Sequence, residues 1–140
     1  MNNKLNSILL IDDDEATNFI HQLVIQDHGS CNHIITKLNG QEAFDYLSTP
    51  NENGLPNPDI IFVDINMPTL DGWGFLEKYQ SKFGSHPSKI IVMLTTSLNK
   101  YDKERAESMK VISEFRNKPL STEILDEILA KYFTNKHILR

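Results

Sequence analysis

The chain has 140 residues, with 19 acidic and 14 basic side chains and a formal net charge of −5. This length allows one domain with a hydrophobic core, which we expect to span about residues 7–133 of a single 1–140 domain. The acidic balance and the lack of a basic stripe argue against direct nucleic-acid binding. The longest fully apolar run, Ile90–Leu94, is far shorter than the roughly 20 residues that span a bilayer. With no signal-peptide pattern and one cysteine, Cys31, the sequence predicts a cytoplasmic protein without a membrane partner.

In the first half of the chain, short apolar runs alternate with segments of helical spacing. Ser7–Ile11 predicts a strand that ends at three consecutive aspartates. The helix expected next ends at Gly29 and buries one apolar face. That face comprises Ala16, Phe19, Ile20, Leu23 and Val24. His33–Lys37 predicts a second strand, and Asn39 is the expected N-cap of a second helix. The residues expected to be buried on this helix are Ala43, Phe44 and Leu47.

The second half repeats this alternation three times. Thr49–Pro58 is rich in proline and asparagine and predicts a loop, followed by a buried strand at Ile60–Val63. A helix beginning near Gly72 precedes the strand Ile90–Leu94, and a charged helix is expected over Asn99–Met109. A weaker strand is predicted around Val111–Phe115. The last helix follows Pro119, with Ser121 as its expected N-cap; its core face is Ile124, Leu125, Ile128, Leu129 and Tyr132.

Five strand–helix units in this order predict an α/β protein with one parallel sheet and helices on both faces. In such a sheet, ligands bind beyond the carboxyl ends of the strands. Polar residues stand at these ends: Asp12 and Asp13, Asp64, Thr95 and Lys118. We therefore expect residues that are far apart in the sequence to converge on one site.

The residue types at these strand ends suit a divalent cation and a phosphoryl group. Clustered carboxylates repel one another unless a cation is bound, and carboxylate and carbonyl oxygens favour Mg²⁺ over zinc. Asp64 follows the most apolar strand and could attack phosphorus to form an acyl phosphate. Thr95 and Lys118 could contact phosphoryl oxygens. Taken alone, the aspartates could instead cap the next helix, Thr95 could be an ordinary strand residue, and Lys118 could face solvent.

Other residues carry weaker signals. The Lys118–Pro119 bond precedes a helix and is expected to be cis, which would turn the lysine inward. No metal-ligand spacing connects the five histidines, which we interpret as surface or helix-face residues. They are His21, His28, His33, His86 and His137. Cys31 and Trp73 are interpreted as packing residues.

Taken in order, four sequence motifs resemble those of response-regulator receiver domains of two-component signalling, similar to the chemotaxis response regulator. The motifs are Ile8–Asp14, Asp59–Gly72 (DIIFVDINMPTLDG), Met93–Ser97 and Asn117–Pro119. The long loop Thr49–Pro58 further resembles stand-alone regulators that partner bacterial phytochromes. This resemblance implies a flavodoxin-like, doubly wound sheet of strand order 2-1-3-4-5 with five helices.

The resemblance also implies a role for each matching residue. Asp64 is the implied phosphorylation site, and Asp12, Asp13, Asp64 and the backbone carbonyl of Asn66 are the implied Mg²⁺ ligands. Thr95 and Lys118 are the implied phosphate-binding residues. The implied switch pair is Thr95 and Phe115. Met109–Ser113 lacks the small residues usual before the fifth strand of the family.

We expect a phosphoacceptor switch that is not an enzyme acting on an outside substrate. A sensor histidine kinase or phosphotransfer protein would donate the phosphoryl group, and a downstream protein, with possible homodimer formation, would read it. Seven residues follow Phe133, so no output domain is expected. A phosphatase of the haloacid-dehalogenase type is an alternative, but Asn66 stands where it would need a second aspartate. The other alternative is a receiver-like binding module that acts without phosphorylation.

Overall fold

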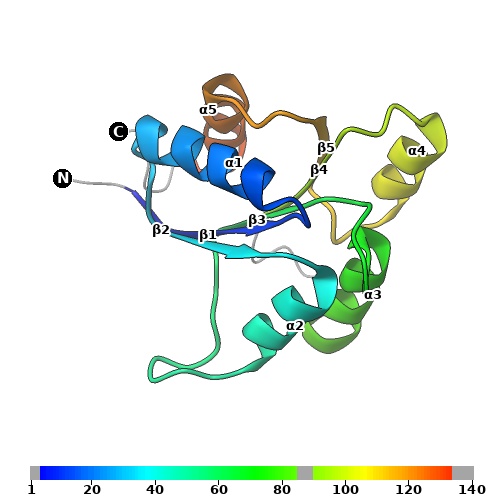
Figure 1. Cartoon of the computed structure of the whole chain (residues 1–140), viewed down its shortest axis with the longest axis horizontal. Coiled ribbons are helices and arrows are strands. Elements are labelled where there is room, and N and C mark those ends of the chain that lie inside the picture. The colour runs from blue at the N-terminus through cyan, green and yellow to red at the C-terminus, as the bar shows by residue number, and fades with distance from the viewer. Residues whose placement is uncertain (1–3, 85–89, 134–140) are drawn as a thin grey trace.

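The computed structural model describes residues 4–84 and 90–133, so His86 and His137 lie outside the described residues. Strands and helices alternate along this part of the chain (Figure 1). They are β1 (Leu5–Ile11), α1 (Glu15–His28), β2 (Cys31–Lys37), α2 (Gly40–Ser48), β3 (Ile60–Val63), α3 (Gly72–Phe83), β4 (Ile90–Thr95), α4 (Lys100–Ser108), β5 (Glu114–Asn117) and α5 (Thr122–Tyr132).

The five strands form one parallel sheet of order β2-β1-β3-β4-β5, which confirms the flavodoxin-like topology. Figure 1 shows α1 and α5 on one face, and α2 and α3 on the other. The strand pleat sends alternate side chains to two separate cores. In β1, Ile8 and Leu10 face the α1–α5 side, whereas Leu9 and Ile11 face the side of α2 and α3. This alternation explains why the central strands read as continuous apolar runs.

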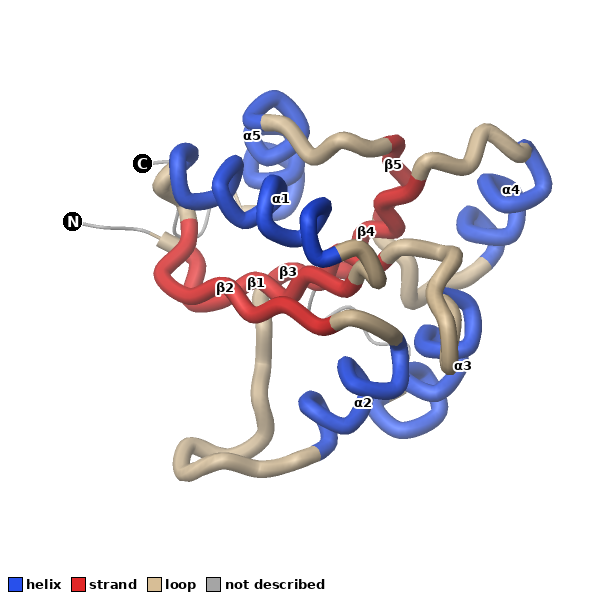
Figure 2. Tube along the Cα trace, in the orientation of Figure 1, coloured by secondary structure: helices blue, strands red, loops and turns tan. Residues whose placement is uncertain are grey.

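Helix boundaries follow the capping residues of the sequence. The side chains of Asn39 and Ser121 accept hydrogen bonds from backbone N–H groups in the first turns of α2 and α5, as predicted. Gly29 ends α1 with a left-handed backbone, φ 74°, which glycine adopts without steric cost. The loop between α2 and β3 extends away from the sheet (Figure 2), and one isolated bridge, Asn51 to Gly54, closes its tip.

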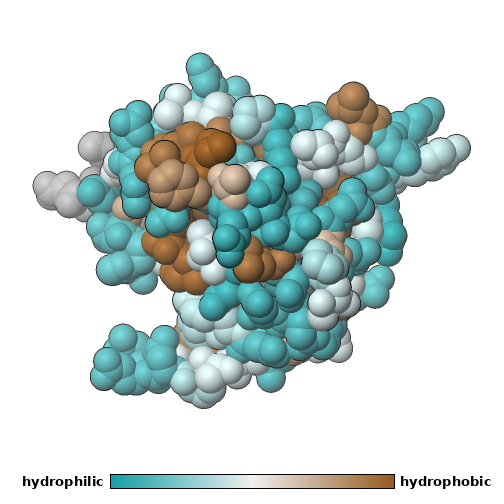
Figure 3. All heavy atoms as spheres, in the orientation of Figure 1, coloured by the Kyte–Doolittle hydropathy of each residue, from teal (hydrophilic) through white to brown (hydrophobic). Residues whose placement is uncertain are grey.

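The predicted apolar face of α1 is wrong except at Val24, which is partly buried against the core. Phe19, Ile20 and Leu23 are 60%, 53% and 47% exposed, while Asn18 and His21 are buried. Asn18 bonds the backbone at the ends of β1 and β2, and His21 bonds the connection after β5. These two polar side chains share the inner face of the helix with Ile25, while Phe19, Ile20 and Leu23 point outward. Figure 3 shows brown side chains gathered over α1, and we call Phe19, Ile20 and Leu23 the α1 patch.

The fifth strand also differs from the prediction, because β5 is Glu114–Asn117 rather than Val111–Phe115. Val111 is buried in the core on the α3 side, and Ile112 packs against it. These apolar residues thus pack in the connection before the strand, and Lys118 still follows directly after it. None of the helices among the described residues is long and apolar enough to cross a membrane.

Candidate functional site

Three carboxylates meet at the carboxyl edge of the sheet. Asp12 and Asp13 follow β1, and Asp64 follows β3, which pairs with β1 at Ile11 and Val63. One carboxylate oxygen from each aspartate lies within 4.8 Å of the others. Asp12 and Asp64 are buried, whereas Asp13 is exposed. The strand pairing thus forms an acidic cluster that opens to solvent on the Asp13 side.

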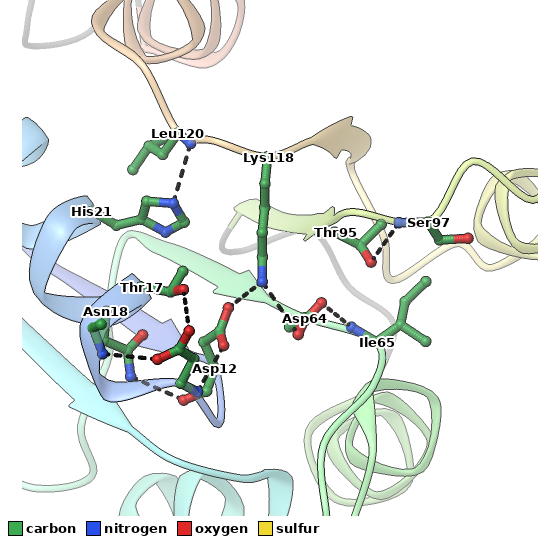
Figure 4. A network of polar contacts seen from close by, with 12 residues as sticks. Asp12, Thr17, Asn18, His21, Asp64, Ile65, Thr95, Ser97, Lys118 and Leu120 are labelled. Carbon is green, nitrogen blue, oxygen red and sulfur yellow. Dashed lines mark hydrogen bonds and ion pairs between the residues drawn. The ribbon is translucent and has the colours of Figure 1, made fainter.

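Lys118 is the cation of this cluster. Its Nζ atom donates to Asp12 Oδ2 and lies 3.3 Å from Asp64 Oδ2 (Figure 4). The Lys118 backbone N–H donates to Thr95 O at 2.9 Å, and the Lys118–Pro119 bond is cis, as predicted. The ammonium group of Lys118 thus lies between the two buried carboxylates.

Burial and charge act in opposite directions on these groups. Burial raises the pKa of Asp64, and the Asp12 carboxylate adds to this effect, although Lys118 partly offsets it. For Lys118, burial alone would lower the pKa, but the hydrogen bond from Lys118 to Asp12 and the charge of Asp64 outweigh it and raise the pKa. The lysine is therefore charged at neutral pH, and the Asp64 carboxylate stands in an unfavourable environment.

The backbone that carries Asp64 is held tightly. The Ile65 N–H donates to Asp64 Oδ1 at 2.9 Å, and the Gly72 N–H donates to Ile65 O at 2.7 Å. A Cβ atom at Gly72 would lie 2.3 Å from the Asp64 carbonyl oxygen and 2.9 Å from Ile65 Cα. Glycine is therefore required at the start of α3 because the loop after β3 passes directly over it.

Gly72→Ala should lower the free energy of unfolding by about 1–3 kcal/mol or more, because the clash is with backbone that cannot move without shifting Asp64. Gly74→Ala is the matched control in the same helix turn. Its Cβ would meet the Leu70 side-chain end at 2.6 Å, which can rotate, so the change should be within about 1 kcal/mol. Urea unfolding of both variants measures the difference, and equal stability would contradict the packing described here.

The other residues singled out from the sequence lie around this cluster. Thr95, at the end of β4, is fully buried, and its Oγ1 accepts a hydrogen bond from Ser97 N at 3.2 Å. Phe115 pairs with Met93 across β4 and β5, two pairs before Thr95 and Asn117. Phe115 is partly buried against the core on the α3 side. Asn66 is exposed two residues after Asp64.

Two residues near the site were missed by the sequence interpretation. Asn18 Nδ2 donates to Asp12 O at 3.0 Å and to Lys37 O at 3.3 Å, which joins the ends of β1 and β2. His21 Nε2 accepts from Leu120 N at 3.3 Å, across to the β5–α5 connection. The available signal was the i, i+3, i+7 spacing of Asn18, His21 and Ile25, which marks the buried face of the helix.

The cluster fits a hard divalent cation. Asp12, Asp13 and Asp64 each offer a carboxylate oxygen, the donor that Mg²⁺ prefers, and Asp13 is exposed to solvent. Mutual repulsion of three carboxylates, with one ammonium to offset it, leaves negative charge for a cation to neutralise. Phosphoryl groups commonly bind beside such a cation and a lysine.

A doubly wound sheet with acidic residues and a lysine at its carboxyl edge is the arrangement expected of a receiver domain. The sequence matches the response regulator receiver domain family over residues 8–130. Because this match covers most of the chain, the protein belongs to the family of receiver domains of two-component response regulators.

Individual relatives agree with this assignment. The chain is 27% identical over 135 residues to the transcriptional regulatory protein CitT of Halalkalibacterium halodurans, covering 96% of this chain and 55% of that protein. Two further relatives are a hybrid histidine kinase of Dictyostelium discoideum and the sensor histidine kinase CheAY of Helicobacter pylori. This chain spans 7% and 14% of their lengths. It thus matches only part of these relatives.

Solved structures show the same fold. A two-component response regulator from Cytophaga hutchinsonii superposes with a TM-score of 0.84 at 29% identity, covering 91% of this chain and 96% of that one. A phosphorylated cyanobacterial phytochrome response regulator, RcpA, superposes with a TM-score of 0.75 at 22% identity, covering 97% and 99%. The predicted likeness to phytochrome-associated regulators is therefore confirmed at the level of the fold.

Proposed function

We propose that the protein is a phosphoacceptor switch in which Asp64 receives a phosphoryl group from a histidine kinase or phosphotransfer protein. The observation that carries this proposal is the convergence of Asp12, Asp13, Asp64 and Lys118 at one edge of the sheet. The phosphorylated protein would act by a changed affinity for a partner rather than by a reaction on an outside substrate.

The chain's own groups would each perform one part of the transfer. An Asp64 oxygen attacks phosphorus, the bond from phosphorus to the donor nitrogen breaks, and the electron pair stays on the donor imidazole. Lys118 is held between Asp12 and Asp64, and its ammonium group would then bind a phosphoryl oxygen. Asp12, Asp13, Asp64 and the Asn66 carbonyl would hold Mg²⁺, which when bound supplies charge neutralisation on the transferring oxygens.

The α1 patch supports a protein donor. α1 begins at Glu15, just after Asp12 and Asp13, so Phe19, Ile20 and Leu23 lie on the helix that follows the acidic cluster. Contiguous exposed apolar side chains on a soluble protein mark interaction surfaces. We assign the patch to the kinase or phosphotransfer protein, since the donor histidine must come within bonding distance of Asp64.

The output surface would be formed by α4, β5 and α5. A pocket of about 210 Å³ lies between them and is lined by Ala106, Ile112 and Phe115, among others. α4 buries one residue, Ala106, among those described on it, so little apolar packing fixes its position. Movement of Thr95 and Phe115 on phosphorylation would reshape this surface for a downstream protein or a second copy of the chain.

Intact-mass measurement after incubation with acetyl phosphate and Mg²⁺ tests the proposal. We expect a gain of one phosphoryl group that EDTA prevents, because the clustered carboxylates need the cation. No gain at any Mg²⁺ concentration would favour a binding module that acts without phosphorylation. Steady turnover of p-nitrophenyl phosphate would favour the phosphatase alternative, which we do not expect because Asn66 cannot serve as an acid or base.

A further inference from the structure

α1 turns two polar side chains toward the site instead of an apolar stripe. Asn18 and His21 are 3% and 4% exposed, and both bond backbone groups of other elements. Burial of a polar side chain is costly unless its hydrogen bonds are made, so such residues on a helix's inward face need a reason. Asn18 joins the ends of β1 and β2, but His21 reaches across to the β5–α5 connection.

The contact made by His21 falls just after Lys118. Its Nε2 atom accepts from the backbone N–H of Leu120 at 3.3 Å, and Leu120 stands two residues beyond the lysine (Figure 4). The Leu120 side chain is itself buried between α1 and α5. On the other side, Lys118 N donates to Thr95 O at 2.9 Å. The segment that carries Lys118 is therefore held at both ends, by β4 before it and by α1 after it.

We propose that His21 is a positioning residue that holds the turn at Lys118 so that the ammonium group lies between Asp12 and Asp64. This inference deepens the proposed function and rests on it for the phosphoryl-transfer step. A displacement of about 1 Å in a group that contacts the transferring atoms can reduce a rate about 100-fold. Fixing a long, flexible lysine through its backbone is therefore of direct value to the transfer.

The protonation state of His21 agrees with this contact. Burial lowers the pKa of His21, and the nearby charge of Lys118 lowers it further, while Asp12 acts in the opposite direction. A neutral imidazole has one nitrogen free to accept a hydrogen bond, and here the Leu120 N–H requires that it be Nε2. The proton then resides on Nδ1.

Three variants separate positioning from simple packing. His21→Leu fills the space but removes the acceptor, whereas His21→Gln keeps a neutral oxygen acceptor near the same place. His28→Leu is the matched control, because His28 also lies on α1 and contacts α5, through Asp126 at 2.7 Å, but far along the helix from Lys118. Thermal unfolding of each variant shows whether it is folded at the assay temperature.

Two readouts are expected to move in opposite directions in His21→Leu. Phosphorylation by acetyl phosphate should slow by about 3- to 30-fold because the ammonium is misplaced. Mg²⁺ should bind about 2- to 10-fold more tightly by calorimetry, because Lys118 no longer competes for Asp12 and Asp64. His21→Gln and His28→Leu should resemble the wild type in both. A purely structural defect would weaken both readouts together, and that result would overturn the proposal.

A double-mutant cycle with Lys118→Ala completes the test. If His21 acts through Lys118, adding His21→Leu to Lys118→Ala should change neither the phosphorylation rate nor the Mg²⁺ affinity further. Additive effects would show that His21 acts elsewhere and would overturn the proposal. The Mg²⁺ arm needs no phosphorylation, so it still tests His21 if the wild type accepts no phosphoryl group, a result that counts against the proposed function alone.

Discussion

Asp64→Asn is expected to abolish phosphoryl acceptance completely. The amide keeps the shape of the side chain but is a very poor nucleophile, and no other carboxylate of the cluster stands at the end of β3 beside Lys118. Incubation with acetyl phosphate and Mg²⁺, followed by a phosphate-affinity gel, should show no shifted band. A band that persists in this variant would contradict the assignment of Asp64.

Asp59→Asn is the matched control for this loss. Asp59 precedes the same strand at its opposite end, and its Oδ2 accepts a hydrogen bond from Asn6 N at 2.7 Å. The asparagine amide retains an oxygen acceptor there, so the fold should be kept. We expect this variant to accept phosphate at the wild-type rate. That result would show that acceptance depends on the Asp64 carboxylate and not simply on a negative charge next to β3.

Asp64→Asn should also stabilise the metal-free protein. The pKa of Asp64 is raised chiefly by burial, so the folded state holds its proton to a higher pH than the unfolded chain does. The wild type therefore gains stability as pH falls through the raised pKa, and is penalised above it. In EDTA at neutral pH, Asp64→Asn should melt roughly 2–6 °C higher. The difference should shrink toward pH 4, and a lower melting temperature would contradict this reading.

The type of each element could be predicted from the sequence because the period of the apolar residues and the capping residues indicated the same helices and strands. Ile60–Val63 and Ile90–Leu94 are buried on both faces, which only a strand in a covered parallel sheet requires, and the structure places them at its centre. The prediction of the buried face of α1 was wrong because the spacing of apolar residues shows which of them share a helix face, but not whether that face packs on the sheet. In α1 the polar Asn18 and His21 make hydrogen bonds inside, and Phe19, Ile20 and Leu23 are exposed.

Site residues could be predicted from topology where each directly follows a strand. Asp12, Asp64 and Lys118 converge because parallel strands end at one edge, so their order in the sequence was sufficient. His21 could not be found in this way, because its partner is a backbone N–H 99 residues away. Side-chain contacts with distant backbone leave no local pattern of residue types, and a three-dimensional structure is needed to show them.

Thr95→Ala is expected to accept phosphate at Asp64 but to lose the coupling to Phe115. The Thr95 hydroxyl accepts from Ser97 N in the structure, and it is fully buried at the end of the strand next to β3. A phosphoryl oxygen on Asp64 would draw this hydroxyl toward itself and release space next to Phe115. A phosphoryl group shifts the equilibrium between the two arrangements of Phe115 only if it contacts one of them more favourably than the other. Without the Thr95 hydroxyl this difference in contact is lost.

Beryllium fluoride, a phosphoryl mimic, and amide chemical shifts give the measurement. In the wild type the mimic should shift signals both around Asp64 and around Phe115. In Thr95→Ala the shifts around Asp64 should remain and those around Phe115 should disappear. Typical allosteric coupling is about 1–3 kcal/mol, so the population of the active arrangement should fall by roughly 5- to 150-fold. Thr95→Ser should restore it, and Thr96→Ala, which alters an exposed neighbouring hydroxyl, should behave as the wild type. Equal shifts at Phe115 in the wild type and in Thr95→Ala would show that the coupling runs through other residues.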